Sequence, residues 1–164
     1  MNFLPVLKPK DFKTVEALAF PIWREHYTPI IGAAQVEYML QKFQAAKAIK
    51  KQVSEGYSYY LLEVPSAGPV GYLAVRPESG ELYLDKFYFL KEYRGKGHAR
   101  EALRFLEEMA KGQRLSRISL SVNKKNPAVK VYEALGFHIA GPVMTDIGNG
   151  YVMDDYRMVK QLHP

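Results

Sequence analysis

The first third of the chain repeats its hydrophobic residues with the period of an α-helix. Asp11 is suited to cap a helix that begins at Phe12. Pro21 lacks a backbone N–H group and clashes with the preceding turn, so a kink or a break is expected near Trp23. The hydrophobic face of this helix comprises Phe12, Val15, Ala19 and Ile22.

A second helical pattern runs from Val36 to Val53. Its apolar residues recur at intervals of three and four, while three lysines lie on the opposite face and indicate a solvated surface. Gly56 is the expected stop. The apolar face consists of Val36, Met39, Leu40, Phe43, Ala46, Ile49 and Val53, and the lysines are Lys47, Lys50 and Lys51.

After Gly56 the pattern becomes typical of β-strands. Three segments rich in Tyr, Leu and Val are separated by turn residues, which predicts an antiparallel meander. These strands are expected over residues 58–64, 70–76 and 81–90. The rest of the chain predicts helices over 97–111 and 127–135, and strands over 118–122, 138–143 and 151–159, with a loop at 144–150.

The predicted order of elements is β-α-α-β-β-β-α-β-α-β-β, which is typical of a mixed α+β fold. The chain has 164 residues, of which 48% are hydrophobic, and no repeat or linker divides it. A single domain over residues 1–164 is therefore expected. The sequence has no run of about 18 apolar residues, so no membrane-spanning helix is predicted. Residues 3–7 are too short for a secretory signal.

The composition excludes several kinds of site. There are no cysteines, which excludes disulfides, Cys-ligated zinc and a thiol nucleophile and makes a cytoplasmic location the expectation. No two of the four histidines have metal-ligand spacing, so no metal site is predicted. Lys and Arg number 23 against 17 Asp and Glu, a net charge of +6. This excess either favours an anionic partner, such as nucleic acid or a phosphate-bearing cofactor, or only maintains solubility.

The segment from Phe87 to Ala99 carries the clearest chemical signal. A predicted strand leads into a glycine-containing loop, which opens a helix. Gly95 and Gly97 permit positive φ and a close approach of the backbone to a ligand. The first N–H groups of the helix then form an anion site, to which Arg94, Lys96 and Arg100 add positive charge. A diphosphate suits such a site, although a tight turn with a helix cap explains Gly-x-Gly equally well.

The wider pattern decides between these interpretations. Neither a Walker A loop nor a complete Rossmann fingerprint is present. Arg94-x-x-Gly97-x-Ala99 resembles the [Q/R]-x-x-G-x-[G/A] signature of the GNAT superfamily of N-acetyltransferases. The segment from Asn126 through Tyr132 to Gly136-Phe137 resembles the second signature of that family. The resemblance extends over nearly the whole chain and implies a mixed, mostly antiparallel twisted sheet of about seven strands, flanked by about four helices.

The resemblance also implies a cofactor and its contacts. The loop would hold the pyrophosphate of acetyl-CoA, and the fourth strand would splay from the fifth to admit the pantetheine arm. Asn126 would bind that arm, and the Tyr132 hydroxyl would lie beside the CoA sulfur as a general acid. The cofactor-binding residues implied are Phe87, Tyr88, Phe89, Arg94, Gly95, Lys96, Gly97, His98, Ala99 and Asn126.

The general base and the acceptor contacts are separate predictions. Strand alternation places Asp85 on one face with Tyr83, Phe87 and Phe89, and burial among aromatic rings would raise the pKa of that carboxyl as a base requires. The alternative is a surface carboxylate paired with Lys86 or Lys91. Of the two adjacent carboxylates in the last strand, at least one is expected to face solvent. Glu25, His26 and Tyr27 are the predicted acceptor contacts, and Asp154 and Asp155 are the strand carboxylates.

The sequence therefore predicts an N-acetyltransferase that moves an acetyl group from acetyl-CoA to a primary amine of a small molecule, an amino acid or a peptide. Direct transfer in a ternary complex is expected, because no residue stands out as a nucleophile for a covalent intermediate. A non-catalytic acyl-CoA-binding module and a basic nucleic-acid-binding domain remain as alternatives. A homodimer through the last strands is a further possibility.

Overall fold

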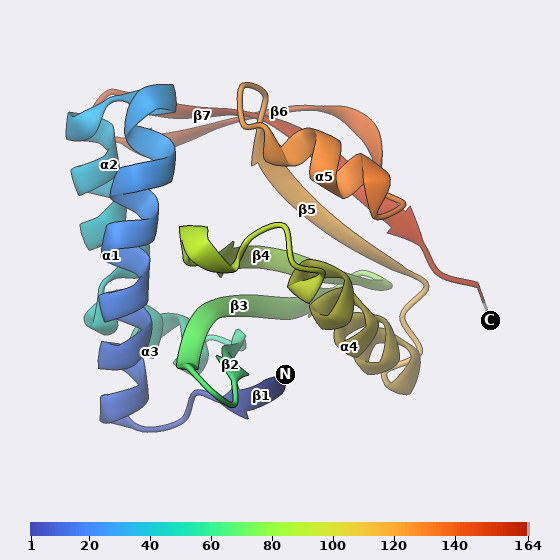
Figure 1. The fold of residues 1–164 in the computed structure, drawn as a ribbon. Coiled ribbons are helices and arrows are strands. Elements are labelled where there is room, and N and C mark those ends of the chain that lie inside the picture. Colours follow the sequence, from blue (N-terminus) through green and yellow to red (C-terminus); the bar gives the residue numbers. More distant parts are fainter. Residues whose placement is uncertain (164) are drawn as a thin grey trace. The chain divides into compact units, whose positions relative to one another are not determined.

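The computed structural model describes residues 1–163. Contacts divide them into two compact units. The first unit comprises Met1–Arg76 and Lys86–Ala99, and the second comprises Pro77–Asp85 and the described residues from Arg100 onward. One seven-stranded sheet has the order β1-β2-β3-β4-β5-β7-β6, as can be followed in Figure 1. The expected mixed sheet of seven strands is confirmed.

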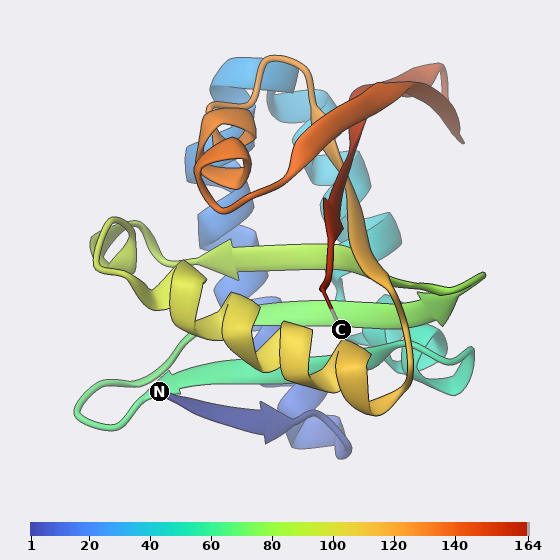
Figure 2. The ribbon, with the colours of Figure 1, turned by 90° about the vertical axis from the view of Figure 1, so that its right-hand side faces the viewer.

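The first unit packs three helices against strands. Figure 2 looks onto these strands with α1 behind them. The pair β2–β3 is antiparallel, as the meander predicts, and β1 also pairs antiparallel with β2. The elements that lie in or enter this unit are β1 (Asn2–Pro5), α1 (Pro9–Ile31), α2 (Ala33–Met39), the π-helical turn η1 (Leu40–Gln44), α3 (Ala46–Ser54), β2 (Ser58–Val64), β3 (Gly68–Glu78), β4 (Glu81–Phe89) and the 3₁₀ turn η2 (Lys91–Tyr93).

The second unit combines two helices with three strands and the first half of β4. The β6–β7 hairpin is long and twisted, as Figure 2 shows. Parallel pairing of β4 with β5 runs from Glu81↔Arg117 to Leu84↔Leu120. The elements are α4 (His98–Gly112), β5 (Arg117–Asn123), α5 (Ala128–Ala134), β6 (His138–Gly148) and β7 (Tyr151–Gln161). Of the described helices, none is long and apolar enough to cross a membrane.

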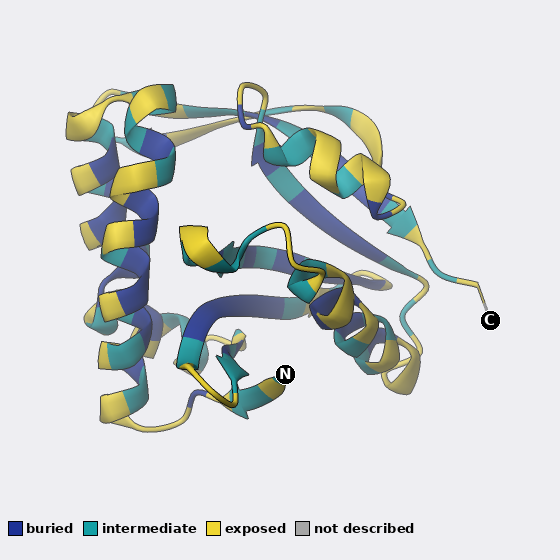
Figure 3. Cartoon of the chain, in the orientation of Figure 1, coloured by how far each residue is buried: buried dark blue, intermediate teal, exposed yellow. Residues whose placement is uncertain are grey.

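The long helix α1 corrects the prediction of a break near Trp23. It runs without interruption from Pro9 to Ile31, although Pro21 and Pro29 lie inside it. Both prolines are exposed, so water can bond to the carbonyl groups that lose their donors. Burial of the opposite face then outweighs the lost bonds; this stripe is dark blue along α1 in Figure 3.

The start of α1 also differs from the expectation. The helix begins at Pro9, three residues before Phe12, and Lys8 occupies the N-cap position. The Asp11 carboxylate still caps the helix, because it accepts hydrogen bonds from the backbone N–H groups of Leu7 and Lys8, both at 3.0 Å. These two bonds lower the pKa of Asp11. Sequence reasoning therefore found the capping residue but assigned it to the wrong helical position.

The second helical pattern is not one helix. It is divided into α2, η1 and α3, and Ala45 has an extended backbone with φ −72° and ψ 152°. The wider π-turn directs buried Gln44 toward β3, where the Tyr72 hydroxyl donates to it at 2.7 Å. The Phe43 carbonyl accepts a hydrogen bond from the buried Lys86 ammonium. These polar contacts with distant strands explain a break that the local periodicity does not reveal.

The strand predictions are largely confirmed. Strand β2 has the predicted bounds, and β3, β4 and β5 lie within two residues of theirs. The predicted loop over 144–150 is wrong, because β6 continues to Gly148. Only Asn149 and Gly150 form the turn, with φ values of 55° and 79°. Most of β6 is exposed or half-buried, whereas β3 is mainly buried, as the colours of Figure 3 show.

Candidate functional site

The loop between β4 and α4 has the backbone geometry that an anion site requires. Gly95 and Gly97 have φ values of 74° and 83°, which confirms the predicted left-handed conformations. A Cβ atom at either glycine would meet no atom within 4 Å, so the backbone here is open to a ligand. Helix α4 begins at His98, directly after Gly97. The first N–H groups of a helix have no acceptor within it and attract anions.

The loop is held in place from both sides. On its strand side, the Leu90 N–H donates to the Val70 carbonyl at 2.8 Å. The Arg94 guanidinium donates to the Phe89 carbonyl at 3.0 Å and pairs with Glu25 of α1 at 2.8 Å. Arg94 therefore ties the loop to α1, and Glu25 neutralises part of its charge. The structure thus brings together a predicted phosphate contact and a predicted acceptor contact as one ion pair.

Other predicted cofactor residues line the same segment. The rings of Phe89 and His98 are stacked, with centroids 6.2 Å apart, and Phe87 lies 5.5 Å from Phe89. The Lys96 ammonium lies 5.7 Å from the centre of the Tyr93 ring. Lys96 is exposed, so its charge is available at the loop surface. The aromatic stacking orients the end of β4 and the start of α4.

Four aromatic side chains of α1, β3 and β4 form a cluster in the first unit, which we call the aromatic cluster: Trp23, Tyr27, Tyr72 and Tyr88. Ring centroids lie 4.3 Å apart for Trp23–Tyr27, 5.6 Å for Trp23–Tyr88 and 5.4 Å for Tyr72–Tyr88. The Tyr27 and Tyr88 hydroxyl oxygens are 3.4 Å apart. His26 contacts Tyr27 edge to face at 4.9 Å. Two of the three predicted acceptor contacts, His26 and Tyr27, therefore lie at this cluster.

The indole N–H of Trp23 is buried and has no hydrogen-bond partner among residues 1–163. Trp23 itself is 4% exposed. A buried donor without an acceptor is unfavourable, so this position suits an oxygen atom of a bound molecule or a water. Sequence reasoning did not single out Trp23 as a polar group.

The second half of β4 carries a buried lysine that sequence reasoning treated only as a possible partner for Asp85. Lys86 is 4% exposed, and its ammonium donates to Gln52 at 2.9 Å and to the Phe43 carbonyl and the Tyr59 hydroxyl. Successive residues of a strand point to opposite faces of the sheet. Lys86 points to the face covered by the helices, and Asp85 points to the other face. Lys86 thus ties β4 to η1 and α3.

The residues of the second motif lie in the second unit. Asn126 is buried, and its side-chain carbonyl accepts a hydrogen bond from the Ala128 N–H at 2.9 Å. Half-buried Tyr132 lies on α5, with its ring 5.6 Å from that of Phe137. Gly136 has φ 98° and follows the C-cap of α5, and Phe137 is buried. Gly136 therefore ends the helix and Phe137 packs in the core, whereas the cofactor roles of Asn126 and Tyr132 stay predictions.

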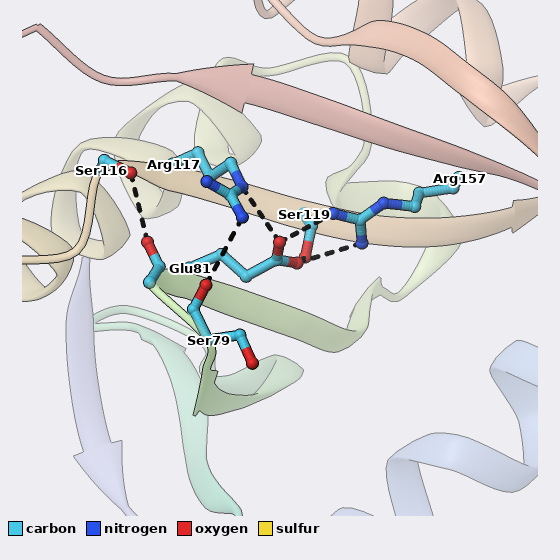
Figure 4. Close-up of polar contacts among 7 residues, drawn as sticks. Ser79, Glu81, Ser116, Arg117, Ser119 and Arg157 are labelled. Atoms are coloured by element: carbon cyan, nitrogen blue, oxygen red, sulfur yellow. Dashed lines mark hydrogen bonds and ion pairs between the residues drawn. The ribbon is translucent and has the colours of Figure 1, made fainter.

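A buried ion cluster on the same unit was missed by sequence reasoning. The Glu81 carboxylate lies between two guanidinium groups, as Figure 4 shows: Arg157 donates at 2.7 and 3.0 Å, and Arg117 at 3.0 Å. The Ser119 hydroxyl also donates to it. These bonds, that of Arg157 above all, lower the pKa of Glu81 to about 2 despite its burial. The cluster joins β4, β5 and β7.

The two adjacent carboxylates of β7, Asp154 and Asp155, differ sharply in solvent exposure. Asp154 pairs with Lys124 at 3.1 Å, and its side chain is 49% exposed, which confirms that one of the pair faces solvent. Asp155 is 3% exposed. Burial, together with the negative charge of Asp154, raises the pKa of Asp155 to about 6. Within residues 1–163, no group of three or more histidine, aspartate or glutamate side chains is placed to hold a metal ion.

Comparison with known proteins assigns the chain to a family. A family model described as the acetyltransferase (GNAT) domain matches residues 27–159. The chain belongs to this family. The matched range contains both signatures and parts of both compact units, so the family resemblance suggested by the motifs is confirmed.

Two curated relatives from Bacillus subtilis match part of this GNAT chain. The uncharacterized N-acetyltransferase YycN of strain 168 is 35% identical over 46% of this chain and 52% of its own length. A probable spermine N(1)-acetyltransferase of subspecies natto is 33% identical over 39% of this chain and 43% of its own length. The chain thus spans about half the length of these relatives.

Solved structures share the fold along the whole chain. The crystal structure of a PaiA N-acetyltransferase from Thermoplasma acidophilum, in complex with coenzyme A, has a TM-score of 0.77. The alignment covers 99% of this chain and 100% of that chain at 17% identity. This comparison confirms that the arrangement of elements is the GNAT fold.

The Glu81 cluster generates a prediction about stability. Replacing Glu81 by Gln should lower the free energy of unfolding at pH 7 by about 3 kcal/mol, because the folded pKa lies well below the unfolded value of 4.5. A lowered folded pKa gives stability that is present above pH 4.5 and is lost as the pH falls toward 2. The difference between wild type and Glu81→Gln should therefore shrink over that range. Urea unfolding at pH 7 and pH 3 measures it.

Glu108→Gln is the matched control, because Glu108 is exposed and pairs with Lys111 at 3.5 Å on the surface of α4. It should change the free energy of unfolding by less than about 0.5 kcal/mol. A loss for Glu81→Gln that is equal at pH 7 and pH 3 would contradict the electrostatic explanation.

Proposed function

We propose that the chain is an N-acetyltransferase that moves the acetyl group of acetyl-CoA to a primary amine in a ternary complex. The observation that carries this proposal is the β4–α4 loop, where Gly95 and Gly97 leave the backbone open at the start of a 15-residue helix. The chain's membership of the GNAT family supports the same cofactor. So does the PaiA structure of the same fold, which was solved in complex with coenzyme A.

The residues at the loop fit a diphosphate. The backbone N–H groups after Gly97 supply donors, and the N-terminal end of α4 contributes positive potential. Lys96 adds a full charge at the surface, while Arg94 contributes through a guanidinium that is already shared with Glu25. Diphosphate binding at the loop therefore depends more on backbone N–H donors than on Arg94. The remaining predicted contacts of the cofactor are the main chain of Phe87–Phe89 and the Asn126 side chain.

The chemistry requires a proton to leave the amine and another to reach the CoA sulfur. An amine with a pKa of about 10.4 is only about 0.1% neutral near pH 7.4, so a base is required. The leaving thiolate accepts a proton or a hydrogen bond readily from a phenol, which is the role proposed for Tyr132. Binding amine and thioester together supplies most of the rate enhancement. Asp85 stays the predicted base from the sequence.

The acceptor is proposed to bind at the aromatic cluster. Cationic groups are attracted to aromatic faces, and Trp23, Tyr27 and Tyr88 provide such faces beside His26. The relatives named as spermine or spermidine acetyltransferases make polyamines one class to test. Amino acids and small peptides are the other classes. Exposed Ile139, Met144 and Val152 on the β6–β7 hairpin leave a homodimer as a further proposal.

Replacing Gly97 by Glu should abolish acetyl-CoA binding, because the substitution adds bulk and negative charge at the proposed pyrophosphate site. Gly80→Glu is the matched control: Gly80 has nearly the same φ of 81°, is equally open, and precedes β4 instead of following it. Calorimetric titration should give micromolar binding for wild type and Gly80→Glu and none for folded Gly97→Glu. If Gly97→Glu and Gly80→Glu bind acetyl-CoA with equal affinity, the proposed pyrophosphate site is contradicted.

Replacing Tyr132 by Phe should lower kcat about a hundredfold and leave the Kd of acetyl-CoA unchanged, because only the hydroxyl that serves the leaving sulfur is lost. Release of the CoA thiol with a panel of amines measures kcat. Tyr57→Phe is the control, since Tyr57 packs against the Arg76 guanidinium and has no proposed role. Unchanged turnover of Tyr132→Phe would rule out the acid role, and binding without transfer to any amine would favour the non-catalytic module.

A further inference from the structure

One buried donor of the first unit has no partner among the described residues. Within residues 1–163, two buried side-chain polar atoms form no hydrogen bond: Trp23 Nε1 and Asp154 Oδ1. Asp154 nevertheless pairs with Lys124 at 3.1 Å, which leaves the Trp23 indole N–H. Trp23 is 4% exposed. Because a buried polar group without a partner is unfavourable, the indole N–H requires an acceptor that these residues do not supply.

Trp23 shares one face of α1 with two of the predicted acceptor contacts. Residues three and four positions apart on a helix are neighbours, which places His26 and Tyr27 beside Trp23. The rings of Trp23 and Tyr27 lie 4.3 Å apart, and His26 contacts Tyr27 edge to face at 4.9 Å. His26 is half-buried, so this face of α1 extends from the buried indole toward the solvent.

Tyr88 of β4 covers the other side of Trp23. Its ring lies 5.6 Å from Trp23 and 6.2 Å from Tyr27. The Tyr27 and Tyr88 hydroxyl oxygens are 3.4 Å apart, which is long for a bond between hydroxyl groups and holds the two rings together only weakly. The backbone of Tyr88 packs closely on β3, since a Cβ atom at Gly71 would overlap the Tyr88 carbonyl oxygen. Displacement of the half-buried Tyr88 side chain would therefore open the cluster at Trp23 without moving β4.

The chemistry of the indole distinguishes between the classes of acceptor. An indole N–H only donates, so its partner must be an atom with a lone pair. The nitrogen atoms of spermidine and spermine are ammonium groups near neutral pH and carry donors alone. A carboxylate would accept, but its burial among aromatic rings requires a cation, and the Arg94 guanidinium is already shared with Glu25. A neutral amide carbonyl accepts the hydrogen bond without adding a buried charge.

We propose that the Trp23 indole N–H binds an amide carbonyl of the acceptor, which makes the acceptor an amino acid amide or the N-terminus of a peptide and not a polyamine. This inference rests on the proposed acetyl transfer and names the substrate class of the acceptor site at the aromatic cluster. An amine without the carbonyl leaves the buried donor unpaired and binds more weakly. The ammonium group of the acceptor is left to the aromatic faces of the cluster.

Acetyl transfer at pH 8 tests the inference with two matched pairs of amines. Glycinamide is paired with 2-methylallylamine, which has its shape but no oxygen, and phenylalaninamide is paired with phenethylamine. Wild type should have a higher kcat/KM for the faster of the two amides than for its matched amine or for spermidine. Trp23→Phe keeps an aromatic ring but removes the N–H, so the preference for that amide should fall about tenfold. Comparing the preference between the two proteins cancels the difference between the amine pKa values.

Tyr57→Phe is the matched control. It also removes a donor from an aromatic side chain of the first unit, but Tyr57 packs against the Arg76 guanidinium outside the aromatic cluster. It should leave the preference for the amide unchanged, and the Kd of acetyl-CoA should be the same in wild type and both variants. If Trp23→Phe fails to fold, benzothienylalanine takes the place of tryptophan during expression. Its sulfur atom replaces the indole N–H in a ring of the same shape, and the same fall in preference is expected.

A direct readout of the indole N–H is available, because Trp23 is the only tryptophan of the chain and gives a single indole resonance in proton–nitrogen NMR. In the CoA-bound protein, the faster-reacting amide should move the indole proton downfield, as a hydrogen bond to a carbonyl does. The matched amine without oxygen should not. An indole proton that stays in place with the amide, or that moves equally with both amines, would overturn the inference.

The kinetic results separate a failure of the inference from a failure of the proposed function. Wild type that transfers acetyl to none of the five amines contradicts the proposed function itself. Active wild type that acetylates spermidine or the amines without oxygen as efficiently as the amides overturns only the inference. So does an unchanged preference in the folded protein without the indole N–H, or an equal fall in Tyr57→Phe.

Discussion

The rest of the structure depends on how strand β4 accommodates two buried charges. Glu81 in its first half is held by Arg117 and Arg157, and Lys86 in its second half is held by Phe43, Gln52 and Tyr59. A buried charge is tolerated only when its partners are well placed. Each half of β4 is therefore fixed, within its own unit, at the position where its charged residue meets those partners. Glu81 anchors the strand to β5 and β7, and Lys86 anchors it to the helices. The loop after Phe89 therefore starts from a well-defined point.

Electrostatics divide the candidate site into satisfied and unsatisfied groups. Glu25 neutralises part of the charge of Arg94, so the proposed anion site at the loop depends mainly on the backbone after Gly97 and on Lys96. The buried Trp23 indole N–H has no hydrogen-bond partner among residues 1–163. An unpaired buried polar group costs free energy, so a substrate that forms a hydrogen bond with such a group gains binding free energy from it. The net charge of +6 fits an anionic cofactor but does not by itself identify one.

Much of the fold could be predicted because its signals are local. The bounds of β2, the left-handed Gly95 and Gly97, and Gly136 at the end of α5 follow from neighbouring residues alone. The break between η1 and α3 could not, because it depends on Tyr72 and Lys86, which lie 28 and 43 residues from their partners. The Glu81–Arg157 contact spans 76 residues, and no periodicity in the chain indicates it. Likewise, burial distinguishes Asp155 from Asp154, which are adjacent and chemically identical in the sequence.

The central claim is that the loop between β4 and α4 binds a diphosphate. The most direct measurement compares two fragments of CoA by calorimetry: adenosine 3′-phosphate 5′-diphosphate and adenosine 3′,5′-bisphosphate, which differ by one phosphoryl group. The account predicts that the diphosphate binds at least about tenfold more tightly, since the helix N-terminus and Lys96 contact the second phosphoryl group. Equal affinity of the two fragments would contradict the claim. The second phosphoryl group would then make no contact with the open backbone at Gly95 and Gly97.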